Sequence, residues 1–170
     1  LRRGLAVAAL AGSIESFIVG QIEDVRARVL ELAGASALPG CEAVLTASGT
    51  DAELLALSIV LSRTSRPVTS ILIDPNETGS GVPHAAMGQH FSGRTAYGAE
   101  VAAGANIDDF AGGRVVTAVV ALRDAQGNPR SVTEIDDEVA RLAARAAADG
   151  RHVQLHVLDA AKTGLGAPSL

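Results

Sequence analysis

The sequence predicts an α/β fold, a three-layer sandwich in which helices cover a mainly parallel sheet. Strand-like apolar runs alternate along the chain with segments of helical periodicity. Aromatic residues make up only 2% of the 170 residues, so the core must be built mainly from Ala, Val, Leu and Ile. The run RVVTAVVAL at 114–122 is rich in apolar and β-branched residues, as is typical of a strand buried on both faces of a parallel sheet.

Apolar spacing and chain-breaking residues place the individual elements. An amphipathic helical pattern begins with Ile14, Ile18 and Ile22 and ends at Gly34. The strand-like run VTSILI is followed by Asp74 and Pro75, which end it. The stretch 92–113 shows no single periodicity. The expected order is helix 13–34, strand 42–46, helix 50–62, strand 68–73, short helix 83–91, strand 114–122, helix 132–149 and strand 152–158.

Composition limits the classes of protein to which the chain can belong. A net charge of −5 argues against a general nucleic-acid binder, which needs a basic surface. No run approaches the roughly 18 apolar residues of a membrane span, and one cysteine excludes an internal disulfide. We therefore expect a cytoplasmic protein whose residues 1–170 form one partial domain, with 1–12 peripheral. Because the sequence starts without methionine, we expect it to be an excerpt of a longer protein.

The turn after the expected strand 42–46 has the features of an anion site. Ser48, Gly49 and Thr50 stand at the start of a helix, where unpaired N–H groups and the helix dipole favour a phosphate. A purely structural alternative is a capping box, in which Thr50 and Glu53 satisfy each other's backbone N–H groups. If the turn binds an anion, its N–H groups should face a pocket at the carboxyl edge of the sheet.

A second polar segment follows the last expected strand. Asp159 and Lys162 stand at the carboxyl end of that strand, the edge on which open α/β sheets bind ligands. We expect Asp159 to project from a central strand into the same pocket as Thr50. Its structural alternative is an ordinary residue of the turn that ends the strand.

Other candidate sites are poorly supported by the residues. His156 and Asp159 would point to opposite faces of a regular strand, so we expect His156 to be a satisfied histidine that faces the core or a helix. His84 and His90 lack a third ligand at suitable spacing, and we predict no metal site. A Rossmann fingerprint, a Gly-x-Ser-x-Gly elbow and a Gly-Lys-Ser/Thr loop are also absent from the sequence.

Together, the segments TASGTDAE at 46–53 and LDAAKTG at 158–164 resemble the large domain of fold-type I pyridoxal-phosphate enzymes. The similarity is greatest to the aminotransferase class V and cysteine desulfurase branch, and it covers roughly residues 42–164. It implies that Asp159 pairs with the pyridine nitrogen. The implied cofactor-binding residues are Ser48, Gly49, Thr50, Thr78, Asp159 and Lys162.

The chain departs from that branch at two of these positions. Lys162 stands where the branch commonly has a glutamine that touches the ring hydroxyl, and 77–78 offers no aromatic or histidine to stack on the ring. These enzymes also bind their cofactor through a lysine beyond the aspartate motif. Lys162 is the chain's single lysine and does not match that position.

The resemblance implies a pyridoxal-phosphate-dependent transferase or lyase that transforms an amino acid or related amine as a homodimer. We expect the 170 residues alone to be inactive, because the Schiff-base lysine is not among them. The alternative that the residues leave open is a non-catalytic or cofactor-free α/β domain with an anion site at a helix N-terminus. A lysine after a further strand downstream would distinguish the two.

Overall fold

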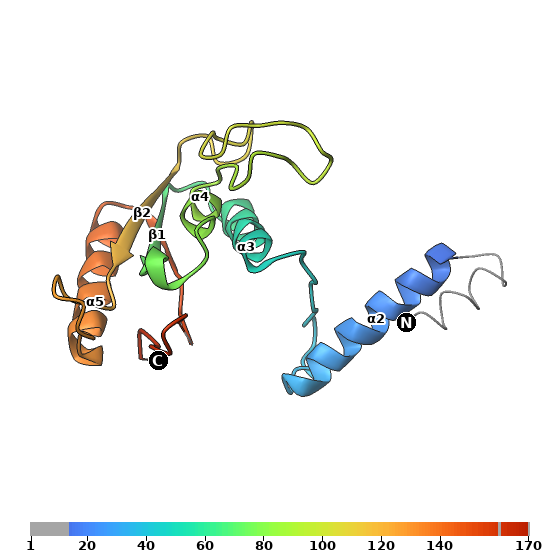
Figure 1. Ribbon diagram of the computed structural model, residues 1–170, viewed down its shortest axis with the longest axis horizontal. Helices are drawn as coiled ribbons and strands as arrows, with labels where there is room; N and C mark the ends of the chain where they lie inside the picture. The colour runs from blue at the N-terminus through green and yellow to red at the C-terminus, as the bar shows by residue number, and fades with distance from the viewer. Residues whose placement is uncertain (1–13, 160, 170) are drawn as a thin grey trace. The chain divides into compact units, whose positions relative to one another are not determined.

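The computed structural model describes residues 14–159 and 161–169, and Figure 1 shows the chain coloured from its N-terminus to its C-terminus. The chain divides into two compact units, Leu1–Thr46 and Ala47–Leu170, and each unit is considered by itself. The expectation that residues 1–12 are peripheral concerns residues outside the described part of the chain.

The first unit contains one described helix, α2 (Ile14–Leu32), which confirms the helix predicted from apolar spacing. None of its residues is buried in the structure. The strand predicted at 42–46 is wrong, because this segment is irregular and is not part of a sheet. Val44 is 63% exposed, and the segment instead accepts a hydrogen bond at Ala43 O from Arg26 Nε, at 2.6 Å. An apolar run without a neighbouring strand has no ladder to join.

The second unit is an α/β structure with a three-stranded, all-parallel sheet packed against helices. Its strands are β1 (Val68–Ile73), β2 (Val115–Val120) and β3 (His152–Leu155), in the order β2-β1-β3. Val68 is opposite both Val115 and His152 in the two parallel pairings. Every residue of β1 is buried, including Thr69 and Ser70, as is typical of a central strand in a parallel sheet.

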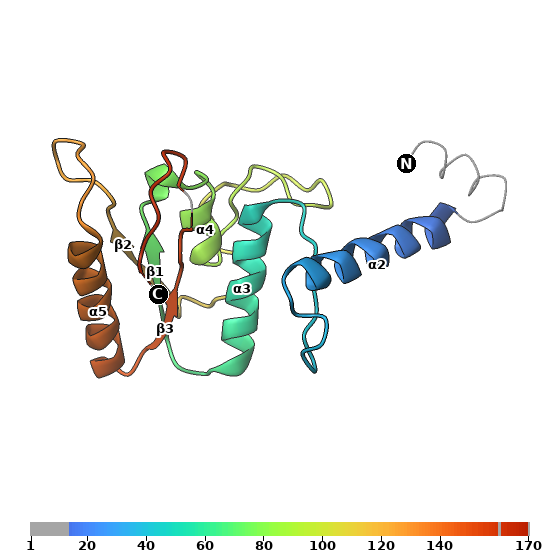
Figure 2. The same ribbon diagram turned by 90° about the horizontal axis from the view of Figure 1, so that it is seen from below.

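Four helical segments accompany this sheet. They are α3 (Gly49–Arg63), the 3-10 turn η1 (Pro75–Glu77), α4 (Val82–Ala86) and α5 (Val132–Ala148). Figure 2 shows the sheet between α5 and the pair α3 and α4. Successive side chains of a strand point to opposite faces. Accordingly, Ile71 packs in the cluster that contains Ile135 of α5, while Val68 packs with Leu57 of α3.

Three elements are clearly shorter than their sequence patterns predicted. The strand expected at 114–122 spans Val115–Val120, and the expectation that it is buried on both faces is wrong, because Val116 and Val119 are 44% and 50% exposed. The helix expected at 83–91 ends at Ala86, because Gly88 adopts a left-handed φ of 73° and lies against Ala111 and Phe110, where a Cβ would approach within 2.7 Å. The strand expected at 152–158 ends at Leu155. Beyond it, Leu158 and Ala167 exchange two backbone hydrogen bonds of 2.9 Å each, so the chain folds back as a closed loop.

Candidate functional site

A cavity of about 150 Å³ lies at the carboxyl end of the sheet, where β1 ends. Its walls come from three parts of the second unit: the start of α3 with Gly49, the turn after η1 with Thr78, and the segment after β3 with His156. The remaining lining is mostly aliphatic. Open parallel sheets bind ligands at this edge, so the cavity stands where the sequence predicted a site.

The start of α3 follows the prediction, but its cap differs from the capping box that the sequence suggested. Ser48 is the N-cap, and its Oγ accepts from the backbone N–H of Asp51 at 3.2 Å and donates to the Asp51 carboxylate at 2.6 Å. Thr50 is therefore the second helical residue, and the predicted pairing of Thr50 with Glu53 is wrong. Among the described residues, no group accepts from the backbone N–H of Gly49 or Thr50.

Two carboxylates near the start of α3 line different cavities. Asp51 lines a separate cavity of about 240 Å³ together with Phe91 and Tyr97. Glu53 lines the cavity at the end of β1 and contacts His156, with 2.6 Å between Glu53 Oε2 and His156 Nδ1. A negative charge therefore stands close to the N–H groups at the helix start, with a histidine as its partner.

His156 connects three elements through its two ring nitrogens. Nδ1 faces the Glu53 carboxylate of α3, and Nε2 lies 2.7 Å from Ser70 Oγ of β1. Because an ionised carboxylate can only accept, Nδ1 carries a proton. Both nitrogens are paired, which confirms the expectation of a satisfied, helix-facing histidine.

The order serine, histidine, carboxylate is the one found in the triads of hydrolases. Here the serine cannot act as a nucleophile, because Ser70 is 0% exposed at the centre of the innermost strand. The cluster therefore links α3, β1 and the segment after β3 and does not attack a substrate.

The glycine-rich turn after η1 lies against the start of α3. A Cβ on Gly81 would lie 3.1 Å from Thr50 Cγ2 and 3.1 Å from Phe91 Cβ, so this close approach favours glycine. Thr78 lines the cavity, and its Oγ1 donates to Pro75 O at 3.2 Å. Two segments that the resemblance assigns to one cofactor, at Gly49–Thr50 and Thr78, are thus neighbours in the fold.

Asp159 and Lys162 do not line this cavity. Both are exposed and belong to the closed loop that follows β3. The expectation that Asp159 projects from a central strand is wrong, since β3 is an edge strand of the described sheet and ends four residues earlier. The loop turns tightly at this point: a Cβ on Gly166 would lie only 2.7 Å from Asp159 O.

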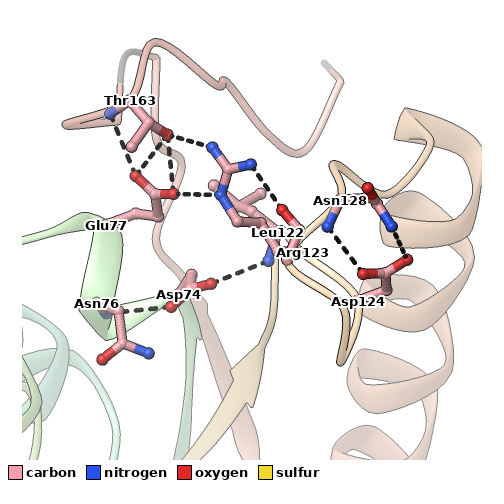
Figure 3. Close-up of polar contacts among 9 residues, drawn as sticks. Asp74, Asn76, Glu77, Leu122, Arg123, Asp124, Asn128 and Thr163 are labelled. Carbon is pink, nitrogen blue, oxygen red and sulfur yellow. Dashed lines mark hydrogen bonds and ion pairs between the residues drawn. The ribbon is translucent and has the colours of Figure 1, made fainter.

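A buried carboxylate that the sequence did not single out anchors this loop. Glu77 is 6% exposed, and its carboxylate accepts from Thr163 Oγ1 at 2.8 Å, Thr163 N at 3.2 Å and Arg123 Nε at 3.1 Å, as Figure 3 shows. The backbone N–H of Lys162 also donates to Glu77 O, at 3.1 Å. The Thr163 hydroxyl, together with Arg123, holds the pKa of Glu77 below its usual value. These bonds hold the loop after β3 against η1, the turn that follows β1.

A second buried carboxylate, Asp74, joins the ends of β1 and β2. Asp74 is 7% exposed and accepts from Asn76 N at 3.1 Å and from Leu122 N at 3.2 Å. In the adjoining turn, hydrogen bonds from Asn128 lower the pKa of Asp124. Asp74 therefore ties the end of β1 to the residue Leu122 just beyond β2, whereas Asp124 stabilises its own turn.

One signal in the sequence could have indicated the histidine cluster. Ser70 and Thr69 interrupt an otherwise apolar buried strand, and a buried hydroxyl requires a partner. No spacing rule indicates which partner, because Ser70 and His156 are 86 residues apart. The same is true of Glu77 and Thr163.

Comparison with known proteins adds no assignment: no family model, curated protein or solved structure matches this chain. Among residues 14–159 and 161–169, no helix is both long enough and apolar enough to span a membrane. Within the same residues, no three His, Cys, Asp or Glu side chains form a group that could hold a metal ion.

Proposed function

We propose that the protein is a pyridoxal-phosphate-dependent transferase or lyase that acts on an amino acid or related amine. In this proposal the second unit is part of a three-layer cofactor-binding large domain, and the protein works as a cytoplasmic homodimer, as the resemblance implies. One observation carries the proposal: the cavity at the end of β1 is lined by both Gly49 and Thr78, two positions that the resemblance assigns to the cofactor.

The groups at the start of α3 fit the phosphate of such a cofactor. The N–H groups of Gly49 and Thr50 have no partner among the described residues, and no atom lies within 4 Å of a Cβ placed on Gly49. The positive end of the helix dipole adds to this preference for an anion. The nearby Glu53 carboxylate opposes it, although this carboxylate already has a polar partner in His156 Nδ1 at 2.6 Å.

In this proposal Asp159 and Lys162 would contact the pyridine ring of the cofactor. Pyridoxal phosphate, when bound, supplies an electron sink for a carbanion at the substrate Cα. Asp159 would hold a proton on the pyridine nitrogen, and Lys162 would stand beside the ring hydroxyl. Both residues follow β3 at the same sheet edge, so the proposal requires the loop after β3 to approach the cavity.

A second candidate function is anion binding without catalysis. It is favoured by the exposure of Asp159 and Lys162 outside the cavity lining, whereas Gly49 lies within it. The two candidates differ in what they require of the ligand. A simple anion site needs only the phosphate, whereas the enzyme also needs the pyridine ring.

Binding of pyridoxal 5′-phosphate to the intact chain, followed by amide chemical shifts, tests the proposal. We expect the changes in amide chemical shift to concentrate at Gly49, Thr50 and Thr78. Thr50→Val should weaken the binding of pyridoxal 5′-phosphate roughly tenfold, since hydrogen bonds to charged groups contribute about 1.5–3 kcal/mol. Thr64→Val, at the other end of α3, is the matched control and should leave the affinity unchanged.

Comparison of ligands separates the two candidate functions. Pyridoxal without phosphate should bind much more weakly than its phosphate. Asp159→Asn should weaken the binding of pyridoxal phosphate but not the binding of inorganic phosphate. Asp149→Asn, which changes the exposed C-cap of α5, is the control and should affect the binding of neither ligand. Equal binding of both anions, insensitive to Asp159, would favour the simple anion site. Shifts remote from α3 would contradict both candidates.

A further inference from the structure

The arginines of the second unit fall into two groups. Those of the first group form ion pairs with Glu100, Glu77 and Glu138, and they are Arg94, Arg123 and Arg130. Those of the second group form no ion pair with any residue that the structure describes, and they are Arg63, Arg66, Arg114, Arg141, Arg145 and Arg151. The two groups also lie in different places.

The second group gathers at the amino-terminal edge of the sheet, opposite the cavity. α3 and α5 end at this edge, and β1 and β3 begin there (Figure 2). Arg151 Nη2 donates to Val68 O at 2.6 Å and to Arg114 O at 3.2 Å. Arg114 Nη1 donates to Thr64 O at 3.2 Å, and the backbone N–H of Arg151 donates to Ala146 O at 2.9 Å. Hydrogen bonds therefore connect the ends of both helices across the starts of the strands.

Some of these arginines have a local structural role. Arg114 and Arg151 bind backbone carbonyls with part of their N–H groups. Arg63 and Arg145 stand in the last turns of α3 and α5, where the negative end of the helix dipole favours a cation. Their side chains are nevertheless exposed and make no hydrogen bond with a described residue, so both guanidinium groups are free to bind a partner.

Arg66 and Arg141 have neither of these roles. Both are exposed, and their side chains make no hydrogen bond or ion pair within residues 14–159 and 161–169. Asp137, one turn before Arg141 on α5, forms no ion pair with it. Acidic residues close to this edge are fewer than the arginines, and they are Asp108, Asp109 and Asp149. The edge therefore carries an excess of positive charge on a chain whose net charge is −5.

We infer that the second group of arginines, called here the arginine edge, is a docking surface for an acidic segment of a partner protein. Guanidinium groups bind carboxylates through two parallel hydrogen bonds, and arginine is enriched in protein interfaces. The negative charge of the whole chain would repel the phosphates of a nucleic acid at long range. Because each exposed ion pair is weak, docking requires several of them at once, and the arginine edge supplies them.

Fluorescence anisotropy of a labelled oligoglutamate peptide, titrated with the intact chain, tests the inference. We expect saturable binding that weakens as salt is added, because salt screens exposed charges. Arg66→Gln combined with Arg145→Gln should weaken the binding roughly fivefold, since two exposed ion pairs are lost. Neither side chain has a partner among the described residues, so this double variant should keep its fold.

Arg28→Gln combined with Arg94→Gln is the matched control. It removes the same amount of charge, but from exposed arginines that already pair with Glu31 and Glu100. The affinity for oligoglutamate should stay unchanged. Equal losses in the two double variants would show that the peptide responds only to net charge and would overturn the inference, as would the absence of saturable binding.

Further measurements decide which partner occupies the arginine edge. A single-stranded oligonucleotide of the same charge should bind more weakly than oligoglutamate, and tighter binding that Arg66→Gln with Arg145→Gln removes would assign the edge to nucleic acid instead. A change in oligomeric state of that variant, measured by analytical ultracentrifugation, would assign it to a second copy of the chain. Either result would overturn the inference.

The inference does not rest on the proposed function, because the cavity lies at the carboxyl end of the strands. Saturating pyridoxal phosphate should leave the affinity for oligoglutamate unchanged. Competition between the two ligands would show that the peptide binds at the cavity, and would overturn the assignment to the arginine edge.

Discussion

Helices α2 and α5 have similar lengths, 19 and 17 residues, and both have apolar residues at helical spacing. They differ completely in burial. α5 buries Ile135, Val139 and Ala146, because the sheet provides apolar neighbours such as Ile71 and Val120. α2 buries no residue, and Ile22 is 43% exposed. Apolar spacing therefore predicts that a helix forms, but a partner surface decides whether its apolar face contributes to stability.

The same difference separates two strand-like runs. Val68–Ile73 lies between two parallel neighbours and is buried throughout. The run at 42–46 is also apolar in part, yet Val44 and Leu45 are 63% and 45% exposed and the segment joins no sheet. Hydrogen-bonded neighbours, and not composition, distinguish these two segments.

The largest expected effect tests the comparison of the helices directly. Ile135→Ala should lower the free energy of unfolding by about 2–5 kcal/mol, since it removes buried methyl groups and leaves a cavity. Ile22→Ala makes the same change on α2 and should cost less than about 1 kcal/mol. Urea unfolding followed by circular dichroism measures both. Equal losses would show that α2 is buried in the protein in solution.

A second prediction concerns the buried Glu77 carboxylate of the second unit, which accepts hydrogen bonds from Thr163 and Arg123. Its pKa is lowered in the folded state, so the unfolded chain binds more protons and stability falls as the pH drops below about 4. Glu77→Gln should reduce this acid sensitivity, and Arg123→Met should destabilise the unit by removing the partner of a buried carboxylate.

The control for this prediction is an ion pair of the same chemistry at the surface. Glu100 is 83% exposed and lies 3.6 Å from Arg94, so Glu100→Gln should leave both stability and its pH profile nearly unchanged. Unfolding by urea at several pH values gives the comparison. Identical acid profiles for Glu77→Gln and the wild type would show that Glu77 does not contribute to acid sensitivity.

The smallest effect concerns the start of α5. Ser131 and Glu134 form a complete capping box, in which the Ser131 hydroxyl and backbone lower the pKa of Glu134. Ser131→Ala should cost about 1 kcal/mol of unfolding free energy. Ser131→Thr keeps the hydroxyl and should retain most of the stability. A loss as large as that of Ile135→Ala would mean that packing, and not the cap, is disturbed.

Local patterns in the sequence were sufficient for the main elements of the second unit. VTSILI predicted β1 to the residue, and the spacing of Ile135 and Val139 with Gly150 as the stop predicted α5 to within one residue. The helix start at Gly49 and Thr50 was also predictable. In each case the signal lies within about 20 residues, because caps, turns and amphipathic faces are made by neighbours along the chain.

Only the tertiary structure decided which side chains of these elements come into contact. Ser70 contacts His156 and Glu77 contacts Thr163, in both cases across 86 residues, and no spacing rule links such positions. The closed loop after β3 placed Asp159 outside the cavity that its position in the sequence suggested. Local preference sets the conformation of a segment, whereas burial and polar pairing depend on surfaces that come together only when the chain folds.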